Sequence, residues 1–437
     1  MSRKLRNIII VLGTILVLAV IISLPPVWVH IGWRLDNVIL IVSRWIHPPE
    51  NVIFVPSGGS TTTPVAPTET LLPTSTPEIP PTPTITPTPL PSGVQLKGVR
   101  FVHQHDKWNY CAPSNLSMVL SYWGVWATRD TIAHVVKPWD EDKNVMPYEL
   151  QDYVDNYTDL KALVRVGGNL QILKNLLANN FVVLVEKGVT TFRDTTTGKF
   201  AWMGHYNTVL GYDDNTQSVI VDDSYIGTAD NPGLGTNLHI PYSEFIDQWR
   251  DFDYLFLVVY PPEKQNDVLN AIGVLADEAA ANQEAARVAE EETKTQSGLE
   301  LFMAWFNLGT SRVRLQDYQG AADAYDQAYR VYPDIPEDLR PWRILWYQTG
   351  PYFAYYYTDR YQDVINLADD AISSTPKPYI EESFYWRAMA ELALGDQSKA
   401  IDDLNTAYQY HPGFPPVVDE MQQLGIPIPT PIPTPAS

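Results

Sequence analysis

The spacing of hydrophobic residues divides residues 95–261 into helices followed by strands. Apolar side chains recur at helical spacing in four segments, at 113–123, 130–136, 147–156 and 169–178. Short apolar or β-branched runs follow in four more, at 181–186, 206–212, 218–222 and 255–260. Because the helices come first and turn residues separate the strands, the pattern predicts an α+β domain whose antiparallel sheet packs on the first helix.

A different pattern begins after Pro261, where the strand signal stops. Residues 262–300 are rich in alanine and glutamate and predict a solvated acidic connecting helix. Residues 301–425 carry small and large apolar residues at the spacing of tetratricopeptide repeats. The first copy is marked by Trp305, Leu308, Gly309, Ala321, Tyr325, Ala328 and Pro333. With a weaker copy at 345–378 and a third at 381–414, the sequence predicts an all-α tetratricopeptide-repeat domain.

The N-terminal segment 1–55 contains an apolar run from Ile8 to Leu24, preceded by Arg3, Lys4 and Arg6. About 17 residues rising ~1.5 Å each are enough for a spanning helix. The basic residues belong on the cytoplasmic side, so everything after the run lies outside the cytoplasm. A cleaved signal peptide is the alternative, but no clear small-x-small site precedes the prolines that end the run. We therefore expect an uncleaved N-terminal transmembrane helix.

Proline and threonine dominate two further segments. Residues 56–94 contain runs such as TPTPTITPTPLP, which cannot bury a core. This composition predicts an extended, polyproline-like stalk. The same composition returns in 426–437 and predicts a Pro-rich tail.

The overall charge restricts the partners. The chain has 30 Lys and Arg against 51 Asp and Glu, a formal net charge of −21. Phosphate backbones are bound by basic surfaces, so we predict no nucleic-acid partner. A single cysteine excludes an intramolecular disulfide. The sequence predicts neither a cofactor nor a bound metal.

The single cysteine, Cys111, lies in the stretch QHDKWNYCAPSNLSMVLSYWG, which begins at Gln104. Proline is favoured in the first turn of a helix, so Pro113 predicts that Cys111 lies at the start of a buried helix. Unpaired N–H groups and the positive end of the helix dipole lower a thiol pKa there. Gln104 is close enough to donate a side-chain N–H beside the sulfur. Without other signals, a lone cysteine would be read as a small buried hydrophobe.

Two later segments supply the groups that a nucleophilic thiolate needs, a base and a carboxylate that orients the base. His205 follows a glycine and opens the apolar strand HYNTVLGY, so its ring can project at the strand end. The next strand ends in Asp222 and Asp223. Antiparallel pairing would bring one of these two carboxylates to His205. The spacing thus predicts a Cys–His–Asp site with Gln104 as oxyanion donor, and it leaves Asp222 or Asp223 open.

These motifs together resemble the C39-like cysteine peptidases, papain-fold relatives of the bacteriocin-processing double-glycine peptidases. The resemblance covers about 100–261 and rests on Cys-x-Pro-Ser with an upstream Gln, Gly-His-Tyr before a Gly-Tyr-Asp-Asp turn, the strand end Val-x-Asp-Ser-Tyr, and DKNVMPYELQDYV. It implies a papain-like fold with Cys111 as nucleophile and His205 as base. Asp223 would orient the base, and Gln104 would help to form the oxyanion hole.

Two departures from the family pattern bear on this resemblance. The interval from Gln104 to Cys111 is one residue longer than the papain-like norm. Tetratricopeptide repeats stand where bacteriocin processors have a transporter, so specificity for double-glycine sites is not implied.

The sequence as a whole predicts a membrane-anchored, extracytoplasmic cysteine peptidase that hydrolyses peptide bonds in a peptide or protein substrate. Its repeats would bind a partner protein or peptide, and its N-terminal helix would contact the membrane. One alternative is a non-enzymatic peptide-binding or scaffold protein with a peptidase-like domain. Another is an amide or acyl transferase that uses the same three residues. Reactivity of the thiol distinguishes the peptidase from the binding protein.

Overall fold

The computed structural model describes residues 54–57, 89–107, 109–139, 141–190, 201–375 and 377–430. The predicted transmembrane helix, most of the predicted stalk and the end of the tail lie outside these ranges. Within them, no helix combines the length and the apolarity that crossing a bilayer requires.

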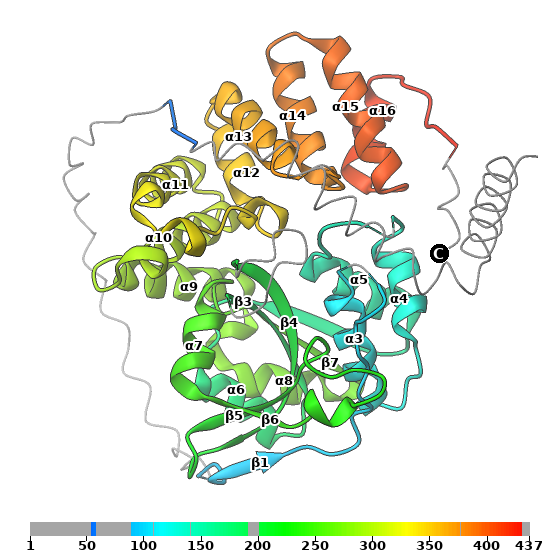
Figure 1. Ribbon diagram of the computed structural model, residues 1–437, viewed down its shortest axis with the longest axis vertical. Helices are drawn as coiled ribbons and strands as arrows, with labels where there is room; N and C mark the ends of the chain where they lie inside the picture. The colour runs from blue at the N-terminus through cyan, green and yellow to red at the C-terminus, as the bar shows by residue number, and fades with distance from the viewer. Residues whose placement is uncertain are drawn as a thin grey trace, which may run out of the picture.

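The first folded part is an α+β domain built on one antiparallel sheet (Figure 1). Its strands are β1 (Gly93–Gln95), β2 (Lys161–Arg165), β3 (Val183–Val189), β4 (Met203–Asp213), β5 (Ser218–Asp222), β6 (Leu238–Pro241) and β7 (Phe256–Tyr260). Its helices are α3 (Cys111–Tyr122), α4 (Arg129–Val136), α5 (Pro147–Tyr157), α6 (Leu170–Ala178) and α7 (Tyr242–Arg250). The strand order is β2-β7-β3-β4-β5-β6, with β1 paired to β4. The predicted α+β class and antiparallel sheet are confirmed.

The core lies where α3 packs on the middle of the sheet. Strands β3, β5 and β7 are buried at every residue, and β4 at all but its two ends. Leu116, Val119 and Leu120 of α3 are fully buried in the same cluster. This packing explains why the apolar pattern marked these four strands so clearly. Strands β1, β2 and β6 were not predicted. β1 is only three residues long and begins within the predicted stalk, whereas β2 and β6 are sheet edges whose partly exposed residues give a weak apolar signal.

The second folded part is entirely helical, as predicted. After α8 (Gln265–Ile272) and α9 (Glu278–Glu292) come α10 (Gly298–Arg314), α11 (Tyr318–Val331), α12 (Gly350–Tyr356), α13 (Tyr361–Ser373), α14 (Glu381–Ala393), α15 (Gln397–Tyr410) and α16 (Pro415–Gln423). The small residues of the repeat pattern allow close helix contact. A Cβ on Gly309 of α10, for example, would lie 2.7 Å from the ring of Tyr325 on α11.

The connecting segment differs from the solvated acidic helix that its composition predicted. Gly273, at a φ of 58°, ends α8, and a short 3-10 helix at Gly273–Ala276 leads to α9. Helix α9 buries Ala281, Ala285 and Ala289, and it packs against α10. The prediction of a solvated helix is therefore wrong for this face, because the alanines supply a flat surface on which the first repeat packs.

The helical part packs directly on the α+β domain (Figure 1). One hydrophobic cluster joins Trp202 and Phe252 of the sheet domain to Phe302, Phe306 and Ile344 of the helical part. Gln348 adds a hydrogen bond from its Nε2 to the backbone oxygen of Asp251, at 2.7 Å. The α+β domain and the helical part therefore share one hydrophobic cluster, and their cores are not independent.

The described residues at both ends of the predicted stalk, and Phe54 just before it, contact the same folded body. The Phe54 ring lies edge-on to Tyr329 with centroids 4.8 Å apart, and Ser57 Oγ donates to Asp363 at 2.7 Å. At the other end, the Tyr212 hydroxyl donates to the backbone oxygen of Pro91 at 2.7 Å. The segment between them therefore starts on the repeats and returns to the sheet.

Candidate active site

Cys111 is the first residue of α3; it forms no disulfide and is partly buried. The helix behind it is almost completely buried, which fixes the position of its N-terminus. Pro113 lies in the first turn, where its missing N–H costs no helical hydrogen bond. Cys111 therefore lies at the helix start that the sequence predicted for it.

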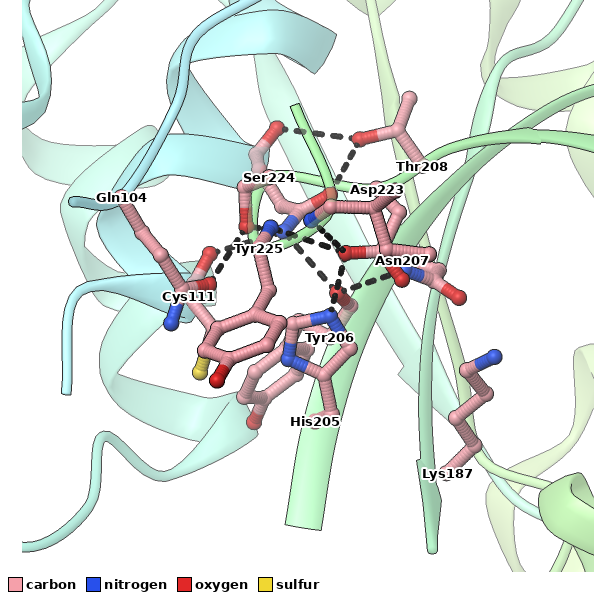
Figure 2. Close-up of polar contacts among 12 residues, drawn as sticks. Gln104, Cys111, Lys187, His205, Tyr206, Asn207, Thr208, Asp223, Ser224 and Tyr225 are labelled. Carbon is pink, nitrogen blue, oxygen red and sulfur yellow. Dashed lines mark hydrogen bonds and ion pairs between the residues drawn. The ribbon is translucent and has the colours of Figure 1, made fainter. Parts of the chain in front are cut away.

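His205 lies near the start of β4, opposite Lys187 of β3, and only 3% of it is exposed. Its Nε2 atom is 3.0 Å from Oδ1 of Asp223, the residue that follows β5 (Figure 2). The same Asp223 oxygen accepts the backbone N–H of Tyr225 at 2.8 Å. These contacts hold the carboxylate against one edge of the imidazole and leave the other ring nitrogen for Cys111.

Charges of opposite sign control the pKa values of these three residues. Burial lowers the pKa of His205, but the charge and hydrogen bond of Asp223, then those of Cys111, outweigh it and raise the pKa to about 9. Burial raises the pKa of the Cys111 thiol, but the hydrogen bond and charge of His205 bring it below the usual value. Burial also raises the pKa of Asp223, and His205 with Lys187 turns this into a net lowering. Each group therefore favours its charged form.

The side chain of Asp222 points to the opposite face of the sheet from that of Asp223, because successive side chains in an extended strand alternate between the two faces. Its Oδ1 atom accepts the backbone N–H of Asn237 at 2.8 Å, and burial raises its pKa to about 6. Of the two aspartates that the sequence left open, the structure brings Asp223 to His205.

Gln104 is connected to the cysteine helix through Ser224. Its side-chain oxygen accepts the Ser224 hydroxyl at 2.8 Å, and its backbone N–H donates to the Ser224 backbone oxygen at 2.9 Å. Because the amide oxygen is held by Ser224, the amide nitrogen of Gln104 points away from Ser224. Figure 2 draws this side chain together with Cys111.

Asn115 is a buried polar residue of the site that the sequence reading missed. Its Nδ2 atom donates to the backbone oxygens of Cys111 and Tyr206, each at 2.9 Å, and to Ser224 Oγ at 3.0 Å. Its Oδ1 atom accepts the Thr208 hydroxyl at 2.8 Å. Asn115 thus connects α3 to β4 and to the loop after β5. The available signal was a polar residue four positions after Cys111, on the same helix face.

The helical part contributes Tyr347, which the sequence reading also missed. Its ring lies edge-on to Trp202, with centroids 5.8 Å apart. A Cβ on Gly204 would lie 2.8 Å from the Tyr347 ring. This close approach explains the glycine before His205 and places a residue of the helical part beside the candidate site.

The arrangement has the groups needed for nucleophilic catalysis. A thiol next to an imidazole can lose its proton to the imidazole, and a carboxylate behind the ring fixes the ring's orientation. An amide N–H beside the sulfur can stabilise a developing oxyanion. The chemistry that fits is acyl transfer from an amide or ester to the sulfur of Cys111.

Both folded parts of the chain match family models of known proteins. The model of the peptidase C39-like family matches residues 96–255, and a tetratricopeptide-repeat model matches 303–334 and 382–413. The predicted resemblance, a C39-like peptidase domain followed by tetratricopeptide repeats, is confirmed. Among the solved structures, one from Bacillus anthracis described as a C39-like peptidase is 18% identical, with a TM-score of 0.30; the alignment covers 38% of this chain and 96% of that one. The comparison with curated proteins gave no match.

Proposed function

We propose that the chain is a cysteine peptidase with Cys111 as nucleophile, His205 as general base and acid, and Asp223 as the residue that orients His205. The observation that supports the proposal is the buried imidazole of His205, whose Nε2 atom lies 3.0 Å from the Asp223 carboxylate and whose charge helps to lower the pKa of the Cys111 thiol. The match of residues 96–255 to a peptidase family supports the same reaction class.

In the proposed reaction, the Cys111 sulfur attacks the carbonyl carbon of a peptide bond. The amide of Gln104 and the N–H groups at the start of α3 stabilise the oxyanion. The His205 imidazolium then gives its proton to the leaving amine, and a thioester remains on Cys111. Water, deprotonated by His205, attacks the thioester and releases the acid and the thiol.

The repeats would bring substrate or partner to this site. Tetratricopeptide arrays present extended surfaces between stacked helices, which suits a peptide or a protein segment. Tyr347, at the start of the second repeat, contacts Trp202 and lies against Gly204, the residue before His205, so a segment bound to the repeats would lie close to the candidate site.

We also propose that the folded parts lie outside the cytoplasm on a single N-terminal anchor. The support is the order of basic residues, apolar run and prolines in the sequence. A membrane-impermeant protease added to intact cells should cut the folded chain. Complete protection until the membrane is permeabilised would contradict this location.

The decisive test is the alkylation rate of Cys111 by iodoacetamide against pH, in the wild type and in His205→Ala. The pKa of the thiol is lowered and that of His205 is raised to about 9. The ion pair of Cys111 thiolate and His205 imidazolium should therefore exist from a pH below the usual pKa of cysteine up to about pH 9. Wild type should therefore react rapidly below neutral pH, and the variant should not.

A peptide-library cleavage assay on the full chain completes the test, with Cys111→Ala as the matched control. If wild type and His205→Ala both titrate like a free cysteine near pH ~8.5, the proposal fails and a peptide-binding module is the better description. If the thiol is reactive but acyl groups pass to an added amine rather than to water, the protein is a transferase.

A further inference from the structure

The loop between α4 and α5 is the second place where the two folded parts meet. Its Trp139 ring lies against the rings of Tyr379 and Tyr410, with centroids 5.5 and 6.0 Å apart. The backbone N–H of Lys143 donates to the Tyr379 backbone oxygen at 3.1 Å. This loop therefore packs on the third repeat, and the contact uses other residues than the one made by Tyr347.

Buried acidic residues and a histidine meet beneath this contact. Single ligand atoms of Asp142, Glu381 and His411 all lie within 4.8 Å of one another. His411 Nδ1 is 2.7 Å from a Glu381 oxygen and 3.6 Å from a Glu149 oxygen. The four residues come from the loop, α5, α14 and the end of α15, so the cluster exists only when the two parts are docked.

Within the part of the chain that the structure describes, an unpaired carboxylate oxygen of Asp142 indicates that the cluster binds a cation. Only 3% of Asp142 is exposed, and its Oδ2 atom has no hydrogen-bond donor among the described residues. Its other oxygen accepts the backbone N–H of Asn144 at 3.3 Å. Leaving a buried carboxylate oxygen without a partner costs free energy. A cation bound by this oxygen would remove the cost.

The charges of the cluster lead to the same conclusion. Three carboxyl groups, those of Asp142, Glu149 and Glu381, lie around His411, and Lys137 donates to the backbone oxygen of Asp142 at 3.1 Å. Buried carboxylates at these distances repel one another unless a proton or a cation lies between them. A divalent ion supplies the missing positive charge in one place.

We propose that Asp142, Glu381 and His411, with Glu149 beside them, form a binding site for a divalent transition-metal ion, Zn²⁺ being the ion that suits them best. One imidazole nitrogen with carboxylate oxygens is a donor set that Zn²⁺ accepts, whereas Ca²⁺ and Mg²⁺ prefer oxygen donors alone. Ligand atoms around tetrahedral Zn²⁺ lie roughly 3.3 Å apart, so small side-chain rotations bring the present atoms into place.

The ion would fix the loop that supports the start of α3. Asn109 lies two residues before Cys111, and its side-chain N–H donates to the backbone oxygen of Asp142 at 2.7 Å. The backbone oxygen of Val145 accepts the Tyr206 hydroxyl at 3.0 Å, next to His205. Metal binding would thus hold the third repeat against the α+β domain and steady the surroundings of the candidate active site.

The test measures Zn²⁺ binding by calorimetry on the full chain after treatment with a chelator. All proteins carry Cys111→Ala, so that the thiol cannot contribute a ligand. The parent should bind Zn²⁺ with one site that involves this cluster. Asp142→Asn, Glu381→Gln and His411→Gln should each weaken that site by about a hundredfold or more.

Glu391→Gln is the matched control, because Glu391 lies on the same helix as Glu381, is 6% exposed, and also has a buried oxygen without a donor among the described residues. It should bind Zn²⁺ like the parent. No Zn²⁺ uptake by the parent, unchanged binding in the three variants, or equal loss in Glu391→Gln would each overturn the proposal.

Hydrogen exchange on the parent chain provides a readout that does not depend on the folding of any variant. Zn²⁺ should slow exchange in residues 141–149 and around His411, because the ion joins these two segments. Protection confined to other histidines, such as His103 and His105, would identify an adventitious ion only and would also overturn the proposal.

Discussion

The clusters around His205 and around Asp142 both consist of buried ionisable side chains, and their charges are balanced differently. Around His205, the carboxylate of Asp223 and the thiol of Cys111 each face the imidazole, so each negative group has a positive partner. Around Asp142, acids outnumber the nearby histidine. The difference teaches that burial alone does not decide whether a charge is stable; the partner decides it.

The pKa directions express the same contrast. The pKa of Asp223 is lowered despite burial, because His205 and Lys187 stabilise its charged form. The pKa of Asp142 is raised to about 8, by burial first and by the charge of Glu381 next. In the cluster around His205, protein groups stabilise the charged carboxylate. In the cluster around Asp142, the carboxyl groups favour their neutral form unless a cation is bound.

The largest effect should come from removing the centre of the balanced cluster. Cys111→Ala should abolish peptide cleavage, because the chain has no other thiol. His205→Ala should reduce kcat by about 10⁴-fold or more, since residues that act as a unit lose nearly everything together. Single-turnover cleavage of a library-derived peptide measures both. Substantial cleavage by Cys111→Ala would mean that the site lies elsewhere.

Replacing the orienting carboxylate should cost less. Asp223→Asn keeps the shape but removes the charge that holds the His205 imidazolium, and kcat should fall by about 10³-fold. Asp222→Asn is the matched control: the Asp222 carboxylate accepts a backbone N–H from Asn237, so kcat should change by less than about twofold. A larger loss at Asp222 than at Asp223 would transfer the role to Asp222.

Removing the proposed oxyanion donor should have a smaller effect still. Gln104→Ala should lower kcat by about 10²-fold, because one amide N–H to the oxyanion is lost while the thiolate–imidazolium pair remains. The iodoacetamide reaction of Cys111 should therefore keep its wild-type pH dependence. If alkylation slows as much as cleavage does, Gln104 acts through the shape of the site and not on the oxyanion.

The smallest effect distinguishes the two clusters by its sign. In chelator-treated protein at pH 7, Asp142→Asn should leave the free energy of unfolding unchanged or raise it by up to about 2 kcal/mol, because a costly buried carboxyl is removed. Asp223→Asn should lower it by about 1–3 kcal/mol, because His205 loses its partner. Urea unfolding measures both. Added Zn²⁺ should reverse the sign for Asp142→Asn, and equal behaviour of the two variants would remove the contrast.

The sequence predicted the elements that have strong apolar periodicity. Helix α3, predicted from 113–123, and strand β5, predicted at 218–222, lie within two residues of their observed bounds. It also singled out Cys111 and His205, because few other residues could serve. The alternation of side chains along β5 could have shown which of Asp222 and Asp223 contacts His205 only if the face of the sheet that holds His205 had been known.

What the sequence could not predict depends on contacts between distant segments. The sheet edges β2 and β6 are defined by their pairing partners and not by their own apolar residues. Tyr347 is about 140 positions from His205, and nothing in its local pattern indicates the contact with Gly204. The cluster of Asp142, Glu381 and His411 spans both folded parts, so no motif spacing exists from which it could have been read.

The docking of Phe54 and Ser57 on the repeats changes what the proline-rich segment can do. Since the segment leaves from Asp363 and returns beside Tyr212, its length would not set the height of the folded body above a bilayer under the proposed anchoring. That height depends on the residues before Phe54. A single cut among the prolines should therefore nick the chain without separating the two fragments, because residues on both sides of the segment contact one folded body.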